Sequence, residues 1–283
     1  MSSHSDDSKL PTWLADYLGA TGEMSSVSAA RRVPGGVVAD TWRVTLGRAG
    51  DWAMKLTPSA ACQTEVVGML SRINCPWLPE EFEVVSTGEG AVSRYRWVVG
   101  AELTSATASL FTNDIHRLHE FAFPARQPSI YVGVREEAEE LVAQPSVGST
   151  VRDLSRAILA GLEPDALGAL LDPLGHITHG DLKPANLIGA NTGVKVIDWE
   201  KVGMLSPEAD LVMHLFTSGL GRPSSTVLRG RHYRTDVMEA AVQWVPVMYV
   251  VHDVWRGLRD AGRALYAKRG AMRLWKDWAD HSA

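Results

Sequence analysis

Short apolar segments separated by glycine-rich turns fill the first hundred positions, whereas the remainder carries longer segments with apolar residues at helical spacing. The short segments predict strands over 26–33, 37–46, 51–57, 79–86 and 91–99. The longer ones predict helices over 112–123, 133–144, 150–160 and 164–171, with Trp-rich helices from residue 235 onward. We therefore expect a segment 1–25 that is partly flexible, a small β-rich lobe over 26–99 and a helical lobe over 100–283.

A hairpin is predicted inside the helical lobe, with strands at 187–188 and 194–197 and an Asn-Thr-Gly turn between them. A hairpin returns its two ends to one place, so Asn186 before it and Asp198 after it are expected to meet. Magnesium takes oxygen ligands such as these, together with substrate phosphates. Asp181 lies upstream in a loop, where it can accept a proton from a hydroxyl about to be phosphorylated.

One stretch of the chain resembles the catalytic core of the protein-kinase-like superfamily. It reads His-Gly-Asp-Leu-Lys-Pro-Ala-Asn over 179–186 and continues after the hairpin as Ile-Asp-Trp-Glu over 197–200. The resemblance implies that Asp181 is the catalytic base and that Asn186 and Asp198 bind magnesium. It also implies an α+β, protein-kinase-like two-lobed fold, with a small β-rich N-lobe and a larger, mostly helical C-lobe.

Two details of this stretch point to kinases of small molecules. Gly180 stands where protein kinases carry Arg, and Trp199-Glu200 stands where they carry Phe-Gly. This form resembles the aminoglycoside phosphotransferase and choline kinase family. Lys183 followed by Pro instead matches the protein-kinase pattern, and the resemblance implies that Lys183 contacts the transferring phosphate.

Lys55 is the candidate for binding the nucleotide phosphates. It lies in the apolar strand Trp-Ala-Met-Lys-Leu, and a lysine there needs either a partner or a solvent-facing side. An isolated lysine of this kind is usually exposed, but the resemblance implies the strand lysine that holds the α- and β-phosphates. Glu65, on a helix predicted over 59–73, is its expected partner.

Two further segments are candidates for nucleotide binding. Gly35 and Gly36 interrupt two strands, and glycine lets backbone amides approach phosphates closely, although such a pair is more often an ordinary hairpin turn. Arg96, Trp97 and Val98 end the last strand of the first lobe. The resemblance implies that this linker binds adenine, the alternative being an edge strand followed by a loop.

Other residues of the helical lobe are expected to be structural. Ser206 and Pro207 predict the start of a helix, as its N-cap and first residue. Asp210 in that helix is expected to brace the catalytic-loop backbone, or to be a plain acid favoured by the helix dipole. His116 and His119 share a helix face, but no further ligand of suitable spacing completes a metal site.

Composition limits the possible functions. The chain has 283 residues, 45% of them hydrophobic, which fits a globular enzyme with a sizeable core. A net charge of -5 argues against a nucleic-acid partner. With 2 Cys and no signal-peptide pattern, a cytoplasmic location is expected. The longest apolar stretch, 240–251, is too short for a membrane span. We expect a monomer or homodimer.

These observations favour an ATP- or GTP-dependent, magnesium-dependent phosphotransferase acting on a hydroxylated, cationic small molecule. An aminoglycoside-type or related antibiotic is the leading acceptor. Choline, a sugar, homoserine or a nucleoside intermediate of antibiotic biosynthesis requires the same core. A protein kinase and a nucleotide-binding pseudokinase without turnover remain alternatives. So does a metal-dependent hydrolase built from His176, His179, Asp181 and Asp198, although it leaves the first lobe unexplained.

Overall fold

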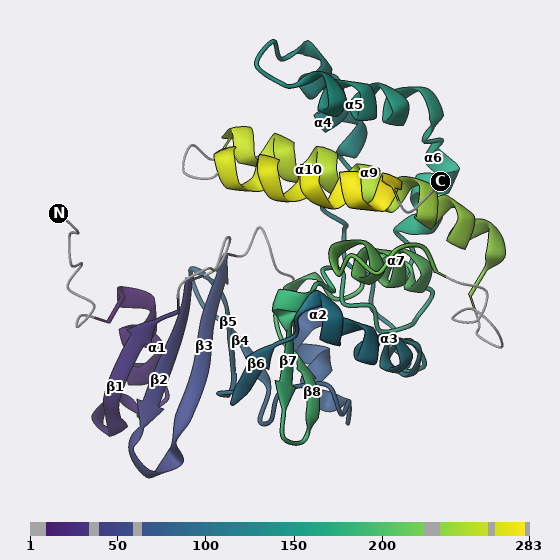
Figure 1. Cartoon of the computed structure of the whole chain (residues 1–283). Coiled ribbons are helices and arrows are strands. Elements are labelled where there is room, and N and C mark those ends of the chain that lie inside the picture. Colours follow the sequence, from purple (N-terminus) through teal and green to yellow (C-terminus); the bar gives the residue numbers. More distant parts are fainter. Residues whose placement is uncertain (1–9, 34–39, 59–63, 224–232, 260–263, 281–283) are drawn as a thin grey trace. The chain divides into compact units, whose positions relative to one another are not determined.

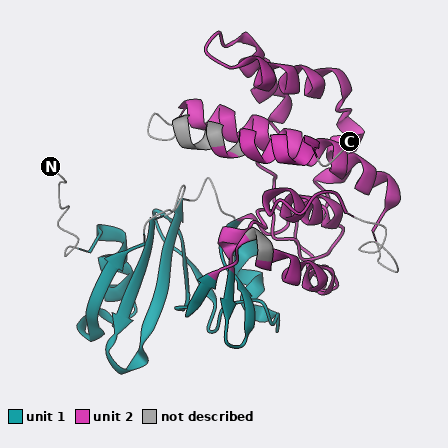
Figure 2. Cartoon of the chain, in the orientation of Figure 1, with its two compact units in different colours: residues 1–101, 188–200 teal, residues 102–187, 201–283 magenta. Residues whose placement is uncertain are grey.

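The computed structural model describes residues 10–33, 40–58, 64–223, 233–259 and 264–280. Antiparallel strands dominate the first part of the chain and helices dominate the rest, which confirms the predicted α+β class (Figure 1). The chain consists of two compact units (Figure 2). Unit 1 comprises residues 1–101 and 188–200, and unit 2 comprises 102–187 and 201–283.

Unit 1 is built on an antiparallel sheet with the strand order β1-β2-β3-β5-β4. Its strands are β1 (Val27–Arg32), β2 (Asp40–Leu46), β3 (Asp51–Pro58), β4 (Glu83–Ser86) and β5 (Gly90–Arg96). All five strands were predicted, although residues 37–39 of the second prediction lie outside the described residues. The register places Lys55 of β3 opposite Thr41 of β2 and Ser93 of β5, so the candidate lysine is held in the central strand of the sheet.

A helix that the sequence did not predict completes the core of unit 1. Helix α1 (Thr12–Ala20) lies in the segment that we expected to be partly flexible. Its buried side chains pack with apolar residues of β2, β3 and β5 in one cluster, formed by Trp13, Leu14, Tyr17, Leu18, Trp42, Val44, Leu46, Trp52, Met54 and Val92. This burial explains why the segment is ordered.

The predicted hairpin is present and forms part of a second sheet. Its strands β7 (Leu187–Ala190) and β8 (Gly193–Val196) are joined by β6 (Gly100–Glu102) in the order β6-β7-β8. Residues 188–200, which the sequence division assigns to the helical lobe, group with unit 1. One reason is a backbone hydrogen bond, since the Val196 N–H donates to the Trp77 carbonyl at 2.7 Å.

Unit 2 is helical and is organised around one fully buried helix. Its helices are α3 (Ser105–His119), α4 (Val134–Ala143), α5 (Ser149–Gly161), α6 (Pro164–Leu170), α7 (Pro207–Thr217), α9 (Thr235–Arg259) and α10 (Ala264–Asp280), and α2 (Thr64–Met69) belongs to unit 1. Every residue of α7 is buried. The Ser206 side chain accepts a hydrogen bond from the Ala209 N–H at 3.1 Å, which confirms the predicted N-cap.

Helix α3 starts earlier than predicted because a capping box forms upstream. The sequence predicted a helix over 112–123, whereas the helix spans Ser105–His119. The Thr104 and Thr107 side chains cap its first turn reciprocally. Among the described helices, none is both long and apolar enough to cross a membrane.

Replacement of the buried Leu14 by Ala should destabilise the protein by about 2–5 kcal/mol, because the side chain is 0% exposed and its removal leaves a cavity. The matched control is Leu110→Ala in α3, since that leucine is 72% exposed. Urea unfolding followed by circular dichroism measures both. Equal midpoints for the two variants would show that α1 does not contribute to the core.

Candidate active site

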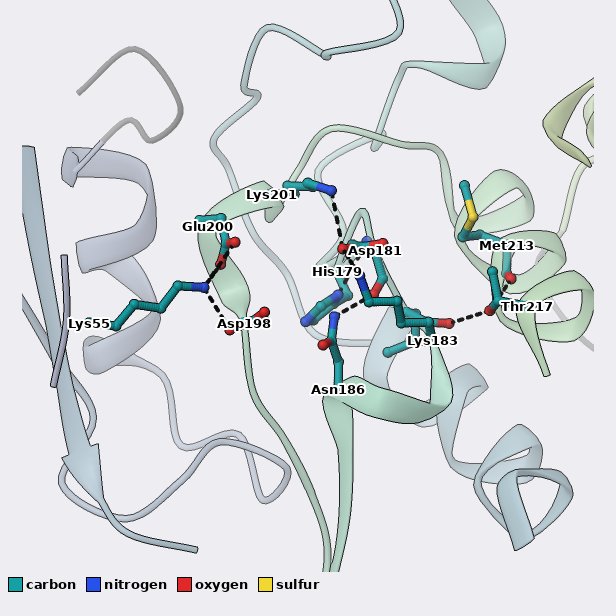
Figure 3. Close-up of polar contacts among 11 residues, drawn as sticks. Lys55, His179, Asp181, Lys183, Asn186, Asp198, Glu200, Lys201, Met213 and Thr217 are labelled. Atoms are coloured by element: carbon teal, nitrogen blue, oxygen red, sulfur yellow. Dashed lines mark hydrogen bonds and ion pairs between the residues drawn. The ribbon is translucent and has the colours of Figure 1, made fainter. Parts of the chain in front are cut away.

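Lys55 is buried and paired with two carboxylates of unit 1 (Figure 3). Its Nζ donates to Asp198 Oδ1 at 2.6 Å and to Glu200 Oε2 at 2.9 Å. Burial acts to lower the pKa of this amine, but the charges of Glu200 and Asp198 outweigh burial and raise the pKa above its usual value. The strand lysine therefore carries a positive charge at neutral pH.

The predicted pairing of Glu65 with Lys55 is replaced by a different one. Glu65 is exposed in the first turn of α2, and the acids that contact Lys55 in the described chain are Asp198 and Glu200. Glu200 was the residue that the sequence argument missed as a partner. Its position could have indicated this role, because Glu200 lies two residues after Asp198 and directly follows the hairpin that groups with unit 1.

A strained turn presents Asp198 and Glu200 together. Asp198 adopts a left-handed backbone conformation with φ of 66°, which is unfavourable for a residue with a side chain. The next residue, Trp199, is 2% exposed and its indole donates to the Val196 carbonyl at 2.7 Å. The buried indole anchors the turn, and the neighbouring carboxylates reach Lys55.

Asp181 lies in the loop of unit 2 that carries the His-Gly-Asp motif, and it is 7% exposed. Its Oδ2 accepts from Lys183 Nζ at 2.9 Å and from Lys201 Nζ at 3.1 Å (Figure 3). Burial acts to raise the pKa of Asp181, but Lys201 and Lys183 outweigh it and hold the pKa well below its usual range. Asp181 is therefore ionised at neutral pH. Lys201 was not predicted.

Asp210 of α7 braces the catalytic loop, which is one of the two roles that the sequence left open for it. Its carboxylate accepts from the His179 N–H at 2.8 Å and from the Gly180 N–H at 2.9 Å. His119 Nε2 lies 3.1 Å from Asp210 Oδ2, which gives that histidine of α3 a structural role. Burial acts to raise the pKa of Asp210, but the hydrogen bond and charge of His119 prevail and lower it.

The second histidine of the pair is also structural. His116 Nδ1 lies 2.8 Å from the Tyr233 hydroxyl, and His119 Nδ1 lies 3.1 Å from the same oxygen. In the described chain no group of three or more His, Cys, Asp or Glu side chains is arranged to hold a metal ion.

The backbone requires glycine at position 180. Its φ of 79° is in the left-handed region, and a Cβ there would overlap the carbonyl oxygen of Lys201. Gly180 thus lets the segment that carries Lys201 pass directly against the loop that carries Asp181. This close approach explains why the chain does not have the arginine that protein kinases carry here.

Asn186 has an amide arrangement that fits a cation ligand. The side chain is 3% exposed, and its Nδ2 donates to the Asp181 carbonyl at 2.8 Å. This bond engages the nitrogen, so Oδ1 is the atom of the amide that can accept a cation. In Asp198, Oδ1 accepts the hydrogen bond from Lys55, so Oδ2 is the oxygen that can face a cation. Asn186 belongs to unit 2 and Asp198 to unit 1, and their joint ligation of magnesium stays a prediction.

Of the two predicted nucleotide-binding segments, one lies outside the described residues and the other lines a cavity. Gly35 and Gly36 lie outside the described residues. Arg96, Trp97 and Val98 line a cavity of about 200 Å³ in unit 1, next to the turn of the β7–β8 hairpin. The backbone N–H groups of Arg96 and Trp97 already donate to the carbonyls of Glu80 and Asp51. Adenine recognition by the backbone therefore stays a prediction that applies best to Val98.

The sheet with its buried lysine and the helical unit with its braced His-Gly-Asp loop define a protein-kinase-like phosphotransferase of the small-molecule class. Residues 84–243 match the phosphotransferase enzyme family, APH. The chain belongs to this family and is a small-molecule kinase. No curated protein matches the sequence.

Solved structures of small-molecule phosphotransferases share this fold. The choline kinase LicA from Streptococcus pneumoniae is 14% identical, with a TM-score of 0.69 over 95% of this chain and 98% of that one. An aminoglycoside 2'-phosphotransferase in complex with GDP is 16% identical, with a TM-score of 0.64 over 96% and 98%. The macrolide 2'-phosphotransferase MphH from Brachybacterium faecium is 17% identical, with a TM-score of 0.55 over 92% and 96%. The predicted fold and family are confirmed.

Replacement of Asp210 by Asn should lower turnover by about tenfold or more and reduce stability by about 1–3 kcal/mol, because the amide nitrogen of Asn opposes a buried N–H donor of the loop. Asp153→Asn is the matched control, because that acid is 67% exposed. Unchanged turnover in a folded Asp210→Asn variant would contradict the bracing role.

His214 of α7 predicts a pH dependence of stability. It is fully buried, its Nε2 lies 3.4 Å from Thr112 Oγ1, and burial lowers its pKa from 6.5 to about 4. Between these values the unfolded chain binds a proton that the folded chain does not. Stability is therefore lost as the pH falls from 6.5 towards 4, by up to about 3 kcal/mol.

His214→Gln should remove this part of the pH dependence, although other groups will contribute to the curve of both proteins. Urea unfolding at pH 7 and pH 5 measures the difference in midpoint for wild type and variant. The same pH dependence in both would show that His214 is not responsible.

Proposed function

We propose that this protein is a magnesium-dependent O-phosphotransferase that moves the γ-phosphate of ATP or GTP to a hydroxyl of a small molecule. The observation that carries the proposal is the buried, ionised carboxylate of Asp181 in a loop held by Asp210. A regulator without turnover has no need of such a carboxylate. An aminoglycoside-type or related antibiotic is the leading acceptor, and choline or another small hydroxylated metabolite is the second.

Asp181 orients the acceptor hydroxyl and receives its proton. The ionised carboxylate accepts a hydrogen bond from the hydroxyl in the ground state. Because its pKa is depressed, Asp181 is a weak base, and it takes the proton only after the acceptor oxygen has begun to bond to phosphorus. Lys183, which contacts Asp181, is proposed to contact the transferring phosphate as well.

The remaining site residues are proposed to bind the nucleotide phosphates and the magnesium ion. Lys55, kept protonated by Asp198 and Glu200, is proposed to hold the phosphate tail of the nucleotide. Asn186 and Asp198 supply the oxygen ligands that magnesium takes. When bound, magnesium neutralises negative charge on the phosphates. Phosphotransferases of this fold have been solved with AMP, with GDP, and with ADP and hygromycin B, which supports nucleotide binding by this chain.

An ATP-consumption screen against aminoglycosides, macrolides, choline, sugars and nucleosides tests the proposal. We expect one class to stimulate magnesium-dependent nucleotide turnover. Asp181→Asn should lower that turnover by about 10²–10⁴-fold, because the proton acceptor is lost. A thermal-shift titration with Mg-ATP should show that the variant still binds nucleotide.

Asp16→Asn is the matched control, because that acid lies on the exposed face of α1. It should turn over like wild type. Wild-type turnover in Asp181→Asn would remove the base assignment. Turnover stimulated by none of the acceptor classes would overturn the proposed activity on these small molecules.

A further inference from the structure

Unit 2 contains a cavity of about 830 Å³ that the proposed mechanism does not use. Residues of α5, α9 and α10 line it together with residues 222–223, and α9 packs against both of the other helices (Figure 1). The described residues that line it include none from the catalytic loop. The volume falls within the range of about 300–1,000 Å³ that is typical of small-molecule sites.

The walls of this cavity are apolar and rich in tryptophan. The apolar lining includes Met238, Val242, Trp244, Val247, Trp275 and Trp278. Indole rings offer flat faces on which other ring systems stack, and apolar walls of this kind gain free energy when a ligand displaces water from them. The lining therefore suits a molecule that contains rings.

Two of the indoles are fixed by the packing of the protein itself. Trp244 is 7% exposed, and it lies so close to α5 that a Cβ on Gly161 would be 2.9 Å from its ring. Trp278 is 4% exposed, and its ring lies 5.6 Å from the ring of Phe216 in α7. The walls are therefore held in place without a ligand, which is the usual state of a small-molecule site.

The backbone of α9 supplies a hydrogen-bond acceptor at the cavity. Pro246 lies inside the helix and has no N–H, so it cannot donate to the carbonyl of Val242, its partner in a regular helix. Val242 is one of the residues that line the cavity. A carbonyl without its helical donor can accept a hydrogen bond from a hydroxyl or an N–H group of a ligand.

The polar side chains of the lining carry no net charge. Arg222, Glu239 and Gln243 are exposed members of the lining, and they supply one cation, one anion and one neutral amide. A charged ligand would meet a like charge as well as an opposite charge at this site. Charge complementarity therefore favours a neutral ligand.

We propose that this cavity binds a neutral small molecule that contains aromatic or alicyclic rings and carries a hydroxyl or N–H group. The rings pack against the tryptophans, and the donor group bonds to the Val242 carbonyl. The inference goes beyond the proposed function, because it assigns a second ligand site that is lined by other residues than those of phosphoryl transfer. A concave cavity of this volume encloses a small molecule, whereas a stable protein interface needs a wider surface of about 800 Å² on each partner.

Fluorescence titration with N-phenyl-1-naphthylamine tests the site, because this neutral aromatic amine fluoresces strongly only when it leaves water. We expect wild type to bind it with a stoichiometry of about 1:1. Ala157→Phe in α5 and Ala279→Phe in α10 each place a ring in the cavity. Each variant should bind the probe about tenfold or more weakly, because the probe and the new ring compete for the same volume.

Both alanines are exposed, so these substitutions should leave the fold intact. The matched control is Ala160→Phe, because Ala160 is also exposed on α5 but does not line the cavity. This control should bind the probe like wild type. Absence of binding by wild type, or wild-type affinity in both cavity-filling variants, would overturn the site.

The hydrogen bond to the Val242 carbonyl is tested with the N-methyl derivative of the same probe, which has no N–H donor. Pro246→Ala restores the helical donor for that carbonyl. This variant should bind N-phenyl-1-naphthylamine several-fold more weakly than wild type and should bind the N-methyl derivative unchanged. Equal losses for both probes, or no loss for either, would remove the carbonyl from the proposed site.

Sedimentation velocity detects a different occupant, a second copy of the chain. A wild-type dimer that dissociates in Ala157→Phe and Ala279→Phe, but not in Ala160→Phe, would show that copies of the chain meet at the cavity and would overturn the small-molecule site. All of these measurements omit nucleotide and acceptor. Their outcomes are therefore independent of the proposed phosphoryl transfer.

Discussion

The helical unit depends on one buried carboxylate. Asp210 is 0% exposed and accepts two backbone N–H groups of the catalytic loop while it contacts His119. A buried charge of this kind is tolerated only when donors surround it. The two N–H groups that stabilise the Asp210 carboxylate belong to the catalytic loop itself. The same hydrogen bonds therefore fix the backbone of the loop. The position of Asp181, two residues beyond His179, follows from that arrangement.

Charge pairing recurs in both units and serves one purpose. In unit 1, Asp198 and Glu200 surround Lys55, and in unit 2, Lys183 and Lys201 surround Asp181. Each central group is buried, where an isolated charge would be neutralised by a shift of its pKa. The paired groups prevent that shift. The protein can therefore keep a charged lysine and a charged carboxylate inside desolvated surroundings, and the proposed functions of Lys55 and Asp181 require these charges.

Local patterns in the sequence were sufficient for the family, the strands, the hairpin and the Ser206 cap, because each depends on neighbouring residues or on motif spacing. For Asp210 they left two roles open, and the structure shows the bracing one. The partners of Lys55 were not predictable in this way. Asp198 and Glu200 lie 143 and 145 positions away, and no periodicity encodes such a pairing. Lys201 contacts Asp181 only because Gly180 lets two segments touch. Helix α1 is ordered by the apolar face of a sheet formed later in the chain. These features depend on packing between distant segments, which only the tertiary structure specifies.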